Sequence, residues 1–428
     1  MSVRVVAGRW VFTGTEVLRD GALALDGDTV LAVGPRAELE ARYGQAERLD
    51  AALLPAFVNA HTHLELSHLG GRIPGGEGLA PWVHLLVATR AEDPGPGRAL
   101  EDAVLDLVDL GVAAVGDVSN TLVSLDPLTR AGIAGSIFHE VFGFSERRIE
   151  AALAQARELR AAAPAPGPGL RIALSPHAVY STHPRVLAEL LRAGPASVHL
   201  AEDPAERAFC AGGSGPFAAM NRALGAVPLP ALGRSAVAVA GPHLGPSSLA
   251  VHAVDLDDDD LALLVRSGAT VVLCPRSNLH IGGQLADLPR LLEAGLPLAV
   301  GTDSLASSPT LSPLAELAAL ARAFPQVAPS RLLPLAWNGA AVGAPEVGRL
   351  SPGAAPGLLA APLGGLRPAD PARWLVETFG AEERRFQWIA RHLPGGSAFG
   401  AFARQGERPP AAPTSDRGLC PRTPAEGS

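Results

Sequence analysis

The chain has 428 residues, 47% of them apolar, which is enough for one large domain with a sizeable core and a smaller one. A net charge of −8 and an aromatic fraction of 4% offer neither a basic nor a stacking surface, so nucleic acid is excluded as a partner. All 35 basic residues are arginine, which excludes Schiff-base chemistry on lysine and a carboxylated lysine bridging two metal ions.

Three cysteines, Cys210, Cys274 and Cys420, are far apart and odd in number, so no disulfide framework or CxxC metal knuckle is expected. The N-terminus does not read as a signal peptide, and no apolar run is long enough to span a bilayer. We therefore expect a cytoplasmic protein that does not bind or span a membrane. A homodimer is one assembly that the sequence leaves open.

The first 52 residues read as the N-terminal part of a small β domain, in which residues 22–33 form two strands around an Asp-Gly turn. From residue 53 to 345, apolar strand-like runs alternate with helical stretches, which predicts a parallel sheet covered by helices. Eight such runs in series fit a (β/α)₈ barrel. The runs are residues 56–61, 113–118, 135–140, 171–177, 197–202, 249–254, 270–275 and 298–304. Helices are expected at residues 99–110, 146–162, 184–193, 258–267 and 313–323.

After residue 345 the chain is rich in Gly, Pro and Ala. Residues 346–393 are assigned to the C-terminal part of the β domain, because residues 348–362 can return to the N-terminal strands. A helix is expected at residues 382–392. The composition of residues 394–428 predicts a poorly ordered tail.

The first barrel strand ends in His61-Thr62-His63. Side chains at positions i and i+2 of a strand point to the same face, so both imidazoles project the same way. Two neutral imidazoles at the end of a buried strand can hold a divalent metal ion. The alternative is a pair of surface histidines in the loop after a strand.

Polar residues recur at the same end of strand after strand, where core packing would favour apolar residues. In a (β/α)₈ barrel the chemistry sits at these carboxyl ends of the strands. The residues at these ends are His61, His63, Asp117, Glu140, His177, His199, Glu202, His252 and Asp303.

The fifth strand supplies a candidate third metal ligand, His199, and a candidate general acid and base, Glu202. The alternatives are a structural histidine and a solvated loop carboxylate beside Asp203 and Glu206.

His252 ends the sixth strand and is placed to hydrogen-bond an attacking water or an oxyanion, unless it is a satisfied core histidine. Asp303 ends the last strand and suits a ligand that also takes the proton of the water, unless it caps the next turn. His177 is a candidate substrate contact. Glu140 and His280, at the same rim, are further candidates for substrate binding.

Six stretches of the chain carry a resemblance to the amidohydrolase superfamily, in its cytosine/adenosine-deaminase-like and chlorohydrolase-like branch. They are PAFVNAHTHLELS (residues 55–67), HAVYS (177–181), VHLAEDPAE (198–206), VHAVDL (251–256), LCPRSN (273–278) and GTDSLAS (301–307). The resemblance covers roughly residues 1–365. It implies a TIM-like metal-dependent hydrolase barrel with a small β-sandwich domain formed by the N- and C-terminal segments.

The same resemblance implies one divalent metal ion, zinc by default with iron or manganese as alternatives, held by His61, His63, His199 and Asp303. It also implies Glu202 as the proton shuttle and His252 as the residue that positions the water. The motifs look most like those of aminodeoxyfutalosine deaminases of a menaquinone pathway. We therefore expect hydrolytic deamination of an aminopurine nucleoside.

Three alternatives stay open at this point. Deaminases of S-adenosylhomocysteine and methylthioadenosine are the nearest rivals in the same branch. A hydrolase of an amide or of a halogenated ring would use the same metal site, and release of ammonia would distinguish the deaminase from it. A non-catalytic binding protein on a decayed barrel would lack Glu202 or Asp303, and both are present.

Overall fold

The computed structural model describes residues 3–93, 95–223 and 232–391. Residue contacts divide the chain into Met1–Pro394 and Gly395–Ser428. The tail predicted at residues 394–428 lies outside the described residues, because these end at residue 391.

Eight parallel strands form the barrel, and each strand overlaps one of the eight predicted runs. They make two four-stranded sheets with the orders β5-β6-β7-β8 and β12-β11-β10-β9. The α/β barrel expected from the sequence is confirmed. The strands are β5 (Phe57–Thr62), β6 (Val112–Ser119), β7 (Ala134–Val141), β8 (Leu170–Pro176), β9 (Ala196–Leu200), β10 (Ser248–His252), β11 (Thr270–Leu273) and β12 (Leu298–Val300).

Two short seams join the half-barrels near the carboxyl ends of the strands. At one seam, the backbone N–H of His199 donates to the carbonyl of His177 at 2.9 Å. At the other, the N–H groups of Thr302 and Asp303 donate to the carbonyl of His61 at 2.9 and 3.0 Å. Residues far apart in the sequence thereby become neighbours at one end of the barrel.

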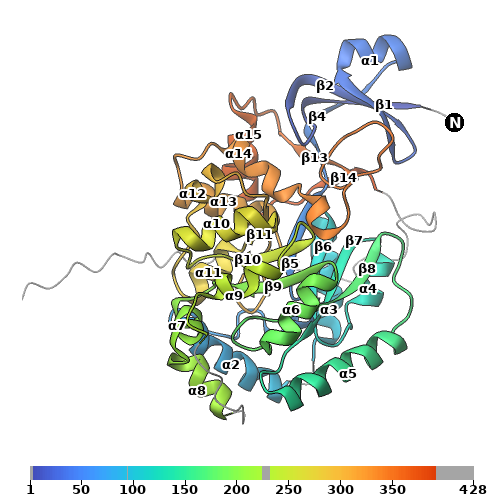
Figure 1. Ribbon diagram of the computed structural model, residues 1–428. Coiled ribbons are helices and arrows are strands. Elements are labelled where there is room, and N and C mark those ends of the chain that lie inside the picture. Colours follow the sequence, from blue (N-terminus) through green and yellow to red (C-terminus); the bar gives the residue numbers. More distant parts are fainter. Residues whose placement is uncertain (1–2, 94, 224–231, 392–428) are drawn as a thin grey trace, which may run out of the picture. The chain divides into compact units, whose positions relative to one another are not determined.

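Helices lie between the barrel strands (Figure 1), and five of them were predicted. A capping box begins one of these, because the Asp257 carboxylate accepts from the Asp260 N–H and the Asp260 carboxylate accepts from the Asp257 N–H. The predicted helices are α3 (Gly97–Asp109), α5 (Glu146–Ala162), α6 (Pro184–Ala193), α10 (Asp258–Ser267) and α13 (Pro313–Ala323). The others of the barrel region are α2 (Leu79–Glu92), α4 (Leu125–Ala131), α7 (Pro204–Gly212), α8 (Gly215–Ala223), α9 (Ala236–Ala240), α11 (Pro275–Ile281), α12 (Leu288–Glu293) and α14 (Pro329–Leu332).

The two ends of the described chain share one mixed sheet with the order β14-β13-β4-β1-β2-β3 (Figure 1). The C-terminal strand β13 pairs antiparallel with β4, where Leu53 faces Ala360. The six strands of this mixed sheet are β1 (Arg4–Phe12), β2 (Val17–Asp26), β3 (Thr29–Pro35), β4 (Glu47–Pro55), β13 (Leu358–Pro362) and β14 (Gln387–Ala390). Only Ala56 separates β4 from the first barrel strand.

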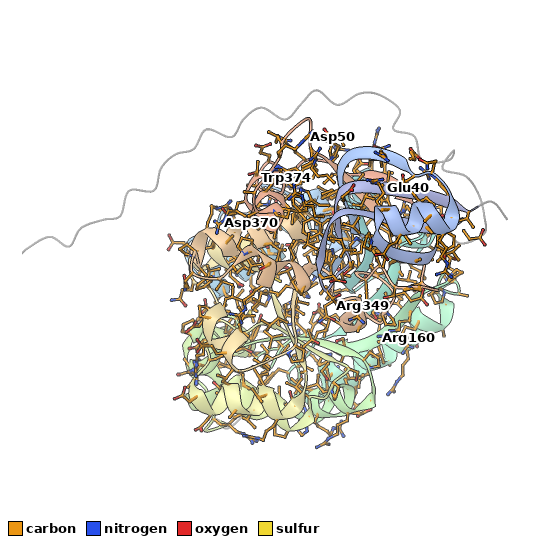
Figure 2. All side chains as sticks on the ribbon, turned by 90° about the horizontal axis from the view of Figure 1, so that it is seen from above. Glu40, Asp50, Arg160, Arg349, Asp370 and Trp374 are labelled. Atoms are coloured by element: carbon orange, nitrogen blue, oxygen red, sulfur yellow. The ribbon has the colours of Figure 1, made fainter. Side chains whose placement is uncertain are left out.

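Helix α1 (Arg36–Tyr43) follows the edge strand β3, and its buried Leu39 packs against Val5 and Ala24 of the sheet. Arg36 also links α1 to β2, because it lies 2.8 Å from a carboxylate oxygen of Asp20 on β2 and 2.5 Å from one of Glu40 on its own helix. Figure 2, which looks onto this side of the molecule, labels Glu40 on α1. The Asp20 carboxylate is exposed, and an exposed ion pair contributes at most about 1 kcal/mol, so the apolar packing of Leu39 is the larger contribution.

The helix predicted at residues 382–392 is wrong, because the structure has strand β14 (Gln387–Ala390) there. Trp388 explains the difference: its indole N–H donates to the carbonyl of Val108 at 2.8 Å, which ties this stretch to the barrel. The helical turns lie earlier, in α15 (Pro371–Arg373) and the π-helix η5 (Trp374–Gly380). His392 lies outside the described residues.

The amino-terminal end of the barrel is filled by apolar side chains. The short helix η4 (Gly339–Val342) and the loop after it pack Val342, Ala344 and Val347 against strand residues such as Val58. The Ser136 hydroxyl fixes this loop by donating to the carbonyl of Val342 at 2.7 Å. The strand ends opposite this floor remain for chemistry.

Among the described residues, no helix combines the length and the apolar character that crossing a membrane requires.

The approach of β12 to β5 predicts a stability effect of Gly301→Ala. A Cβ at Gly301 would lie 2.6 Å from the Cβ of His61 and 2.7 Å from its backbone N and O. We expect this overpacking to lower the free energy of unfolding by about 1–3 kcal/mol, measured by urea denaturation. Gly34→Ala, on β3, is the control, because a Cβ there meets no atom within 4 Å. Equal stability of the two variants would contradict the tight seam.

Candidate metal centre

Four predicted side chains converge at the carboxyl end of the barrel. The Nε2 atoms of His63 and His199 lie 3.2 Å apart. Oδ1 of Asp303 lies 3.5 Å from Nε2 of His63 and 3.9 Å from Nε2 of His61. The candidate ligand atoms of His61, His63 and Asp303 all lie within 4.8 Å of one another, a spacing that could hold one metal ion.

Unusual backbone angles occur around the site, at the ends of three strands. Ala201, His252 and Asp303, at or just after the ends of β9, β10 and β12, have φ angles of +53°, +78° and +55°. Non-glycine residues rarely adopt this left-handed region, and such strain is concentrated at functional sites.

His61 is fully buried, and neither of its ring nitrogens has a hydrogen-bond partner among the described residues. Burial, reinforced by the neighbouring imidazoles, lowers the pKa of His61 well below its ordinary value. Burial likewise lowers the pKa of His199 to about 3. Both rings are therefore neutral at physiological pH, which is the form that binds a divalent cation.

Surrounding hydrogen bonds orient the other ligand candidates. Nδ1 of His199 lies 3.0 Å from the carbonyl of His177 and donates to it, which leaves Nε2 as a lone pair facing His63. Oδ2 of Asp303 accepts from the hydroxyls of Ser277 at 2.5 Å and Ser307 at 3.1 Å. Its other oxygen, Oδ1, faces the imidazoles. Outer partners of this kind are common around metal ligands.

His252 and Glu202 face each other beside this cluster, with Nε2 of His252 3.6 Å from Oε1 of Glu202. The side-chain amide of Asn278 lies 3.2 Å from Nδ1 of His252 and donates to it, so the proton of the neutral ring is on Nε2. Burial lowers the pKa of His252 to about 4. Burial raises the pKa of Glu202 well above its ordinary value, and the charge of Asp303 adds to this shift.

Two of the three predicted substrate contacts lie next to the cluster. The ring centroid of His177 is 4.8 Å from that of His199, and Oε1 of Glu140 is 3.7 Å from Nδ1 of His199. His280 does not join them: it is exposed, and its Nε2 lies 2.9 Å from the carbonyl of Ile73. It thereby ties α11 to the loop before α2.

Several buried polar residues that support the site had no role in the sequence analysis. Ser277 and Asn278 lie in the LCPRSN stretch, but only their contacts to Asp303 and His252 reveal what they do. Glu65 accepts from the N–H groups of Asn120 and Thr121 and fixes the loop after β6. No spacing rule would have found these pairs.

Comparison with known proteins places the chain in a family. The sequence profile of the amidohydrolase family matches residues 52–368, and that of a bacterial imidazolonepropionase-like composite domain matches residues 21–46. The aminodeoxyfutalosine deaminase of Deinococcus radiodurans is 31% identical over 339 residues, covering 74% of this chain and 80% of the relative.

A 5-methylthioadenosine/S-adenosylhomocysteine deaminase of Nitratidesulfovibrio vulgaris is 30% identical over 407 residues, which is 87% of each chain. The crystal structure of Helicobacter pylori aminofutalosine deaminase with methylthio-coformycin matches the fold with a TM-score of 0.76 at 23% identity. That match covers 90% of this chain and 97% of the other. The resemblance seen in the sequence is confirmed, and the chain belongs to the amidohydrolase family.

Proposed function

We propose that this protein is a hydrolytic deaminase of a 6-aminopurine nucleoside and that its substrate is aminodeoxyfutalosine. Water replaces the amino group at C6, which gives the 6-oxopurine and ammonia. The convergence of His61, His63, His199 and Asp303 beside the His252–Glu202 pair carries the proposal. Curated relatives named aminodeoxyfutalosine deaminase support the choice of substrate.

The proposed ligands are three imidazoles and one carboxylate, a donor set that suits zinc. The unpartnered nitrogens of buried His61 fit a cation at this point. An adenosine deaminase structure from Xanthomonas campestris with bound zinc has the same fold, with a TM-score of 0.69. Iron or manganese would accept the same ligands. Such an ion acts as a Lewis acid and lowers the pKa of water toward about 7.

The protein's own residues move the protons. Asp303 takes the first proton of the attacking water, and the Nε2–H group of His252 orients that water or the developing negative charge. Burial raises the pKa of Glu202, which favours the protonated form that a proton donor needs. Glu202 donates its proton to the ring nitrogen beside C6. It then takes the remaining proton of the added hydroxyl group and passes it to the amino group, which leaves as ammonia when the C6–N bond breaks and the C6 carbonyl forms.

His177 and Glu140 are proposed to contact the purine and ribose parts of the substrate. Oε2 of Glu140 already accepts from the side-chain amide of Asn120 at 3.0 Å, and its Oε1 is 3.7 Å from His199. A fixed carboxylate at the mouth of the site suits hydroxyl groups of a sugar.

Deamination of methylthioadenosine or S-adenosylhomocysteine is the second candidate. One observation favours it: the relative with that name aligns over 87% of this chain, more than the aminodeoxyfutalosine deaminase of Deinococcus radiodurans does. The chemistry at C6 is the same for both candidates, and only the group on the ribose differs.

A substrate panel tests the proposal. We expect ammonia release and the ultraviolet change from adenine to hypoxanthine with aminodeoxyfutalosine, at a kcat/KM higher than with methylthioadenosine, S-adenosylhomocysteine or adenosine. A higher kcat/KM for either sulfur nucleoside would favour the second candidate. Failure with every aminopurine nucleoside would refute the deaminase.

Removal of a ligand tests the metal site. We expect about one divalent ion per chain by elemental analysis, and loss of most of it in His199→Ala, because one of the three or four donors typical of such a site is removed. His84→Ala removes an exposed imidazole on α2 and is the matched control. Full metal content in His199→Ala would exclude His199 as a ligand.

The proton shuttle is tested by Glu202→Gln, which keeps the shape of the side chain but cannot donate the proton. We expect the metal content to stay unchanged and kcat to fall about 10²- to 10⁴-fold. Glu189→Gln, on the exposed face of α6, is the control. Normal turnover of Glu202→Gln would remove this residue from proton transfer.

A further inference from the structure

Glu206 is a buried carboxyl group that the mechanism above does not use. It lies on α7 and is fully buried, and its Oε2 accepts a hydrogen bond from the backbone N–H of Glu202 at 3.1 Å. Its Oε1 is buried and has no hydrogen-bond partner among the described residues. The neighbouring Arg207 instead binds the carboxylates of Asp255 at 2.6 Å and Asp260 at 2.7 Å.

The backbone that Glu206 holds is the strained turn that carries Glu202. Ala201 has a φ of +53°, a conformation unfavourable for a residue with a Cβ. Its carbonyl accepts from the N–H groups of Val254 at 2.8 Å and Asp255 at 2.9 Å, beyond the end of β10. The turn is therefore fixed on its carbonyl side by the β10 loop and on its N–H side by Glu206.

The hydrogen bonds on both sides of the turn set the direction of the Glu202 side chain. The turn directs the Glu202 carboxyl group toward His252, with Oε1 3.6 Å from Nε2. A buried N–H group that loses its acceptor is unfavourable, and a turn that is already strained has little to hold it once that hydrogen bond is lost.

We propose that Glu206 is a positioning residue, whose carboxyl group holds the Glu202 N–H and thereby keeps the Glu202 side chain in reach of the substrate. The proposal rests on the role of Glu202 in the proposed function. Burial raises the pKa of Glu206 to about 8, although the N–H groups of Glu202 and Ala201 act in the opposite direction. A group that is mostly neutral at pH 7 can be matched closely by glutamine.

Two variants separate the hydrogen-bond acceptor from the packing. Glu206→Gln keeps an acceptor for the Glu202 N–H, so we expect kcat within about threefold of the wild type. Glu206→Leu keeps the bulk but has no acceptor. Because a misplacement of about 1 Å can cost about 10²-fold in rate, we expect its kcat to fall about 10- to 100-fold. KM should stay within about twofold, and the metal content should not change.

Two further variants guard against an effect on folding alone. Glu206→Asp keeps a carboxyl group but withdraws it from the Glu202 N–H, so we expect a lower kcat than in Glu206→Gln even if the leucine variant does not fold. Ser136→Ala is the control for stability, because it removes a buried hydrogen bond at the opposite end of the barrel. It should unfold more easily and keep its kcat.

Crystal structures supply a readout that does not depend on turnover. In Glu206→Asp or Glu206→Leu we expect Ala201 to leave the left-handed region and the Glu202 carboxyl group to move from His252. The proposal is overturned if both variants keep the wild-type kcat, or if the turn is unchanged in them. It is also overturned if Glu206→Gln loses as much kcat as Glu206→Leu. A wild-type protein without deaminase activity would refute the proposed function instead, and the crystal structures would still decide on the turn.

Discussion

The seam between the last and first barrel strands is the contact on which the site depends. The carbonyl of His61 accepts from the N–H groups of Thr302 and Asp303, and the Thr62 hydroxyl donates to the carbonyl of Asp303 at 3.1 Å. These three bonds close the barrel and set a carboxylate beside two imidazoles. If the seam slipped by one residue, Asp303 would point away from them, because neighbouring residues of a strand face opposite sides.

The cluster of imidazoles behind this seam lowers the stability of the folded protein unless a cation binds to it. The imidazoles of His61 and His199 are buried and neutral, and His61 has no hydrogen-bond partner among the described residues. Buried polar groups without partners lower stability, whereas a cation that binds only the folded state raises it. Binding of the cation and folding of the barrel are therefore linked in the same free energy.

Much of the barrel was predictable because its signals are local. A short apolar run predicts a buried strand. Acidic residues at the start of a helix, such as Asp257–Asp260 of α10, predict where that helix begins. The positions of His61, His199 and Asp303 followed from one rule, that the ends of parallel strands meet at the mouth of a barrel.

Other features depend on partners that the sequence does not name. Asn278 orients His252 and Glu206 holds Glu202 through hydrogen bonds that exist only in the folded chain. The strand at Gln387–Ala390 was read as a helix because tertiary contacts of Trp388, and not local propensity, decide its form.

The pairing of β13 with β4 has a consequence for folding during synthesis. Residues 47–55 leave the ribosome early, whereas their partner at Leu358–Pro362 is made near the end of the described chain. During synthesis the edge of β4 that will receive β13 has no partner of its own. Such an edge can pair with another chain, so the nascent protein passes through a period of aggregation risk that ends only when its late strand arrives.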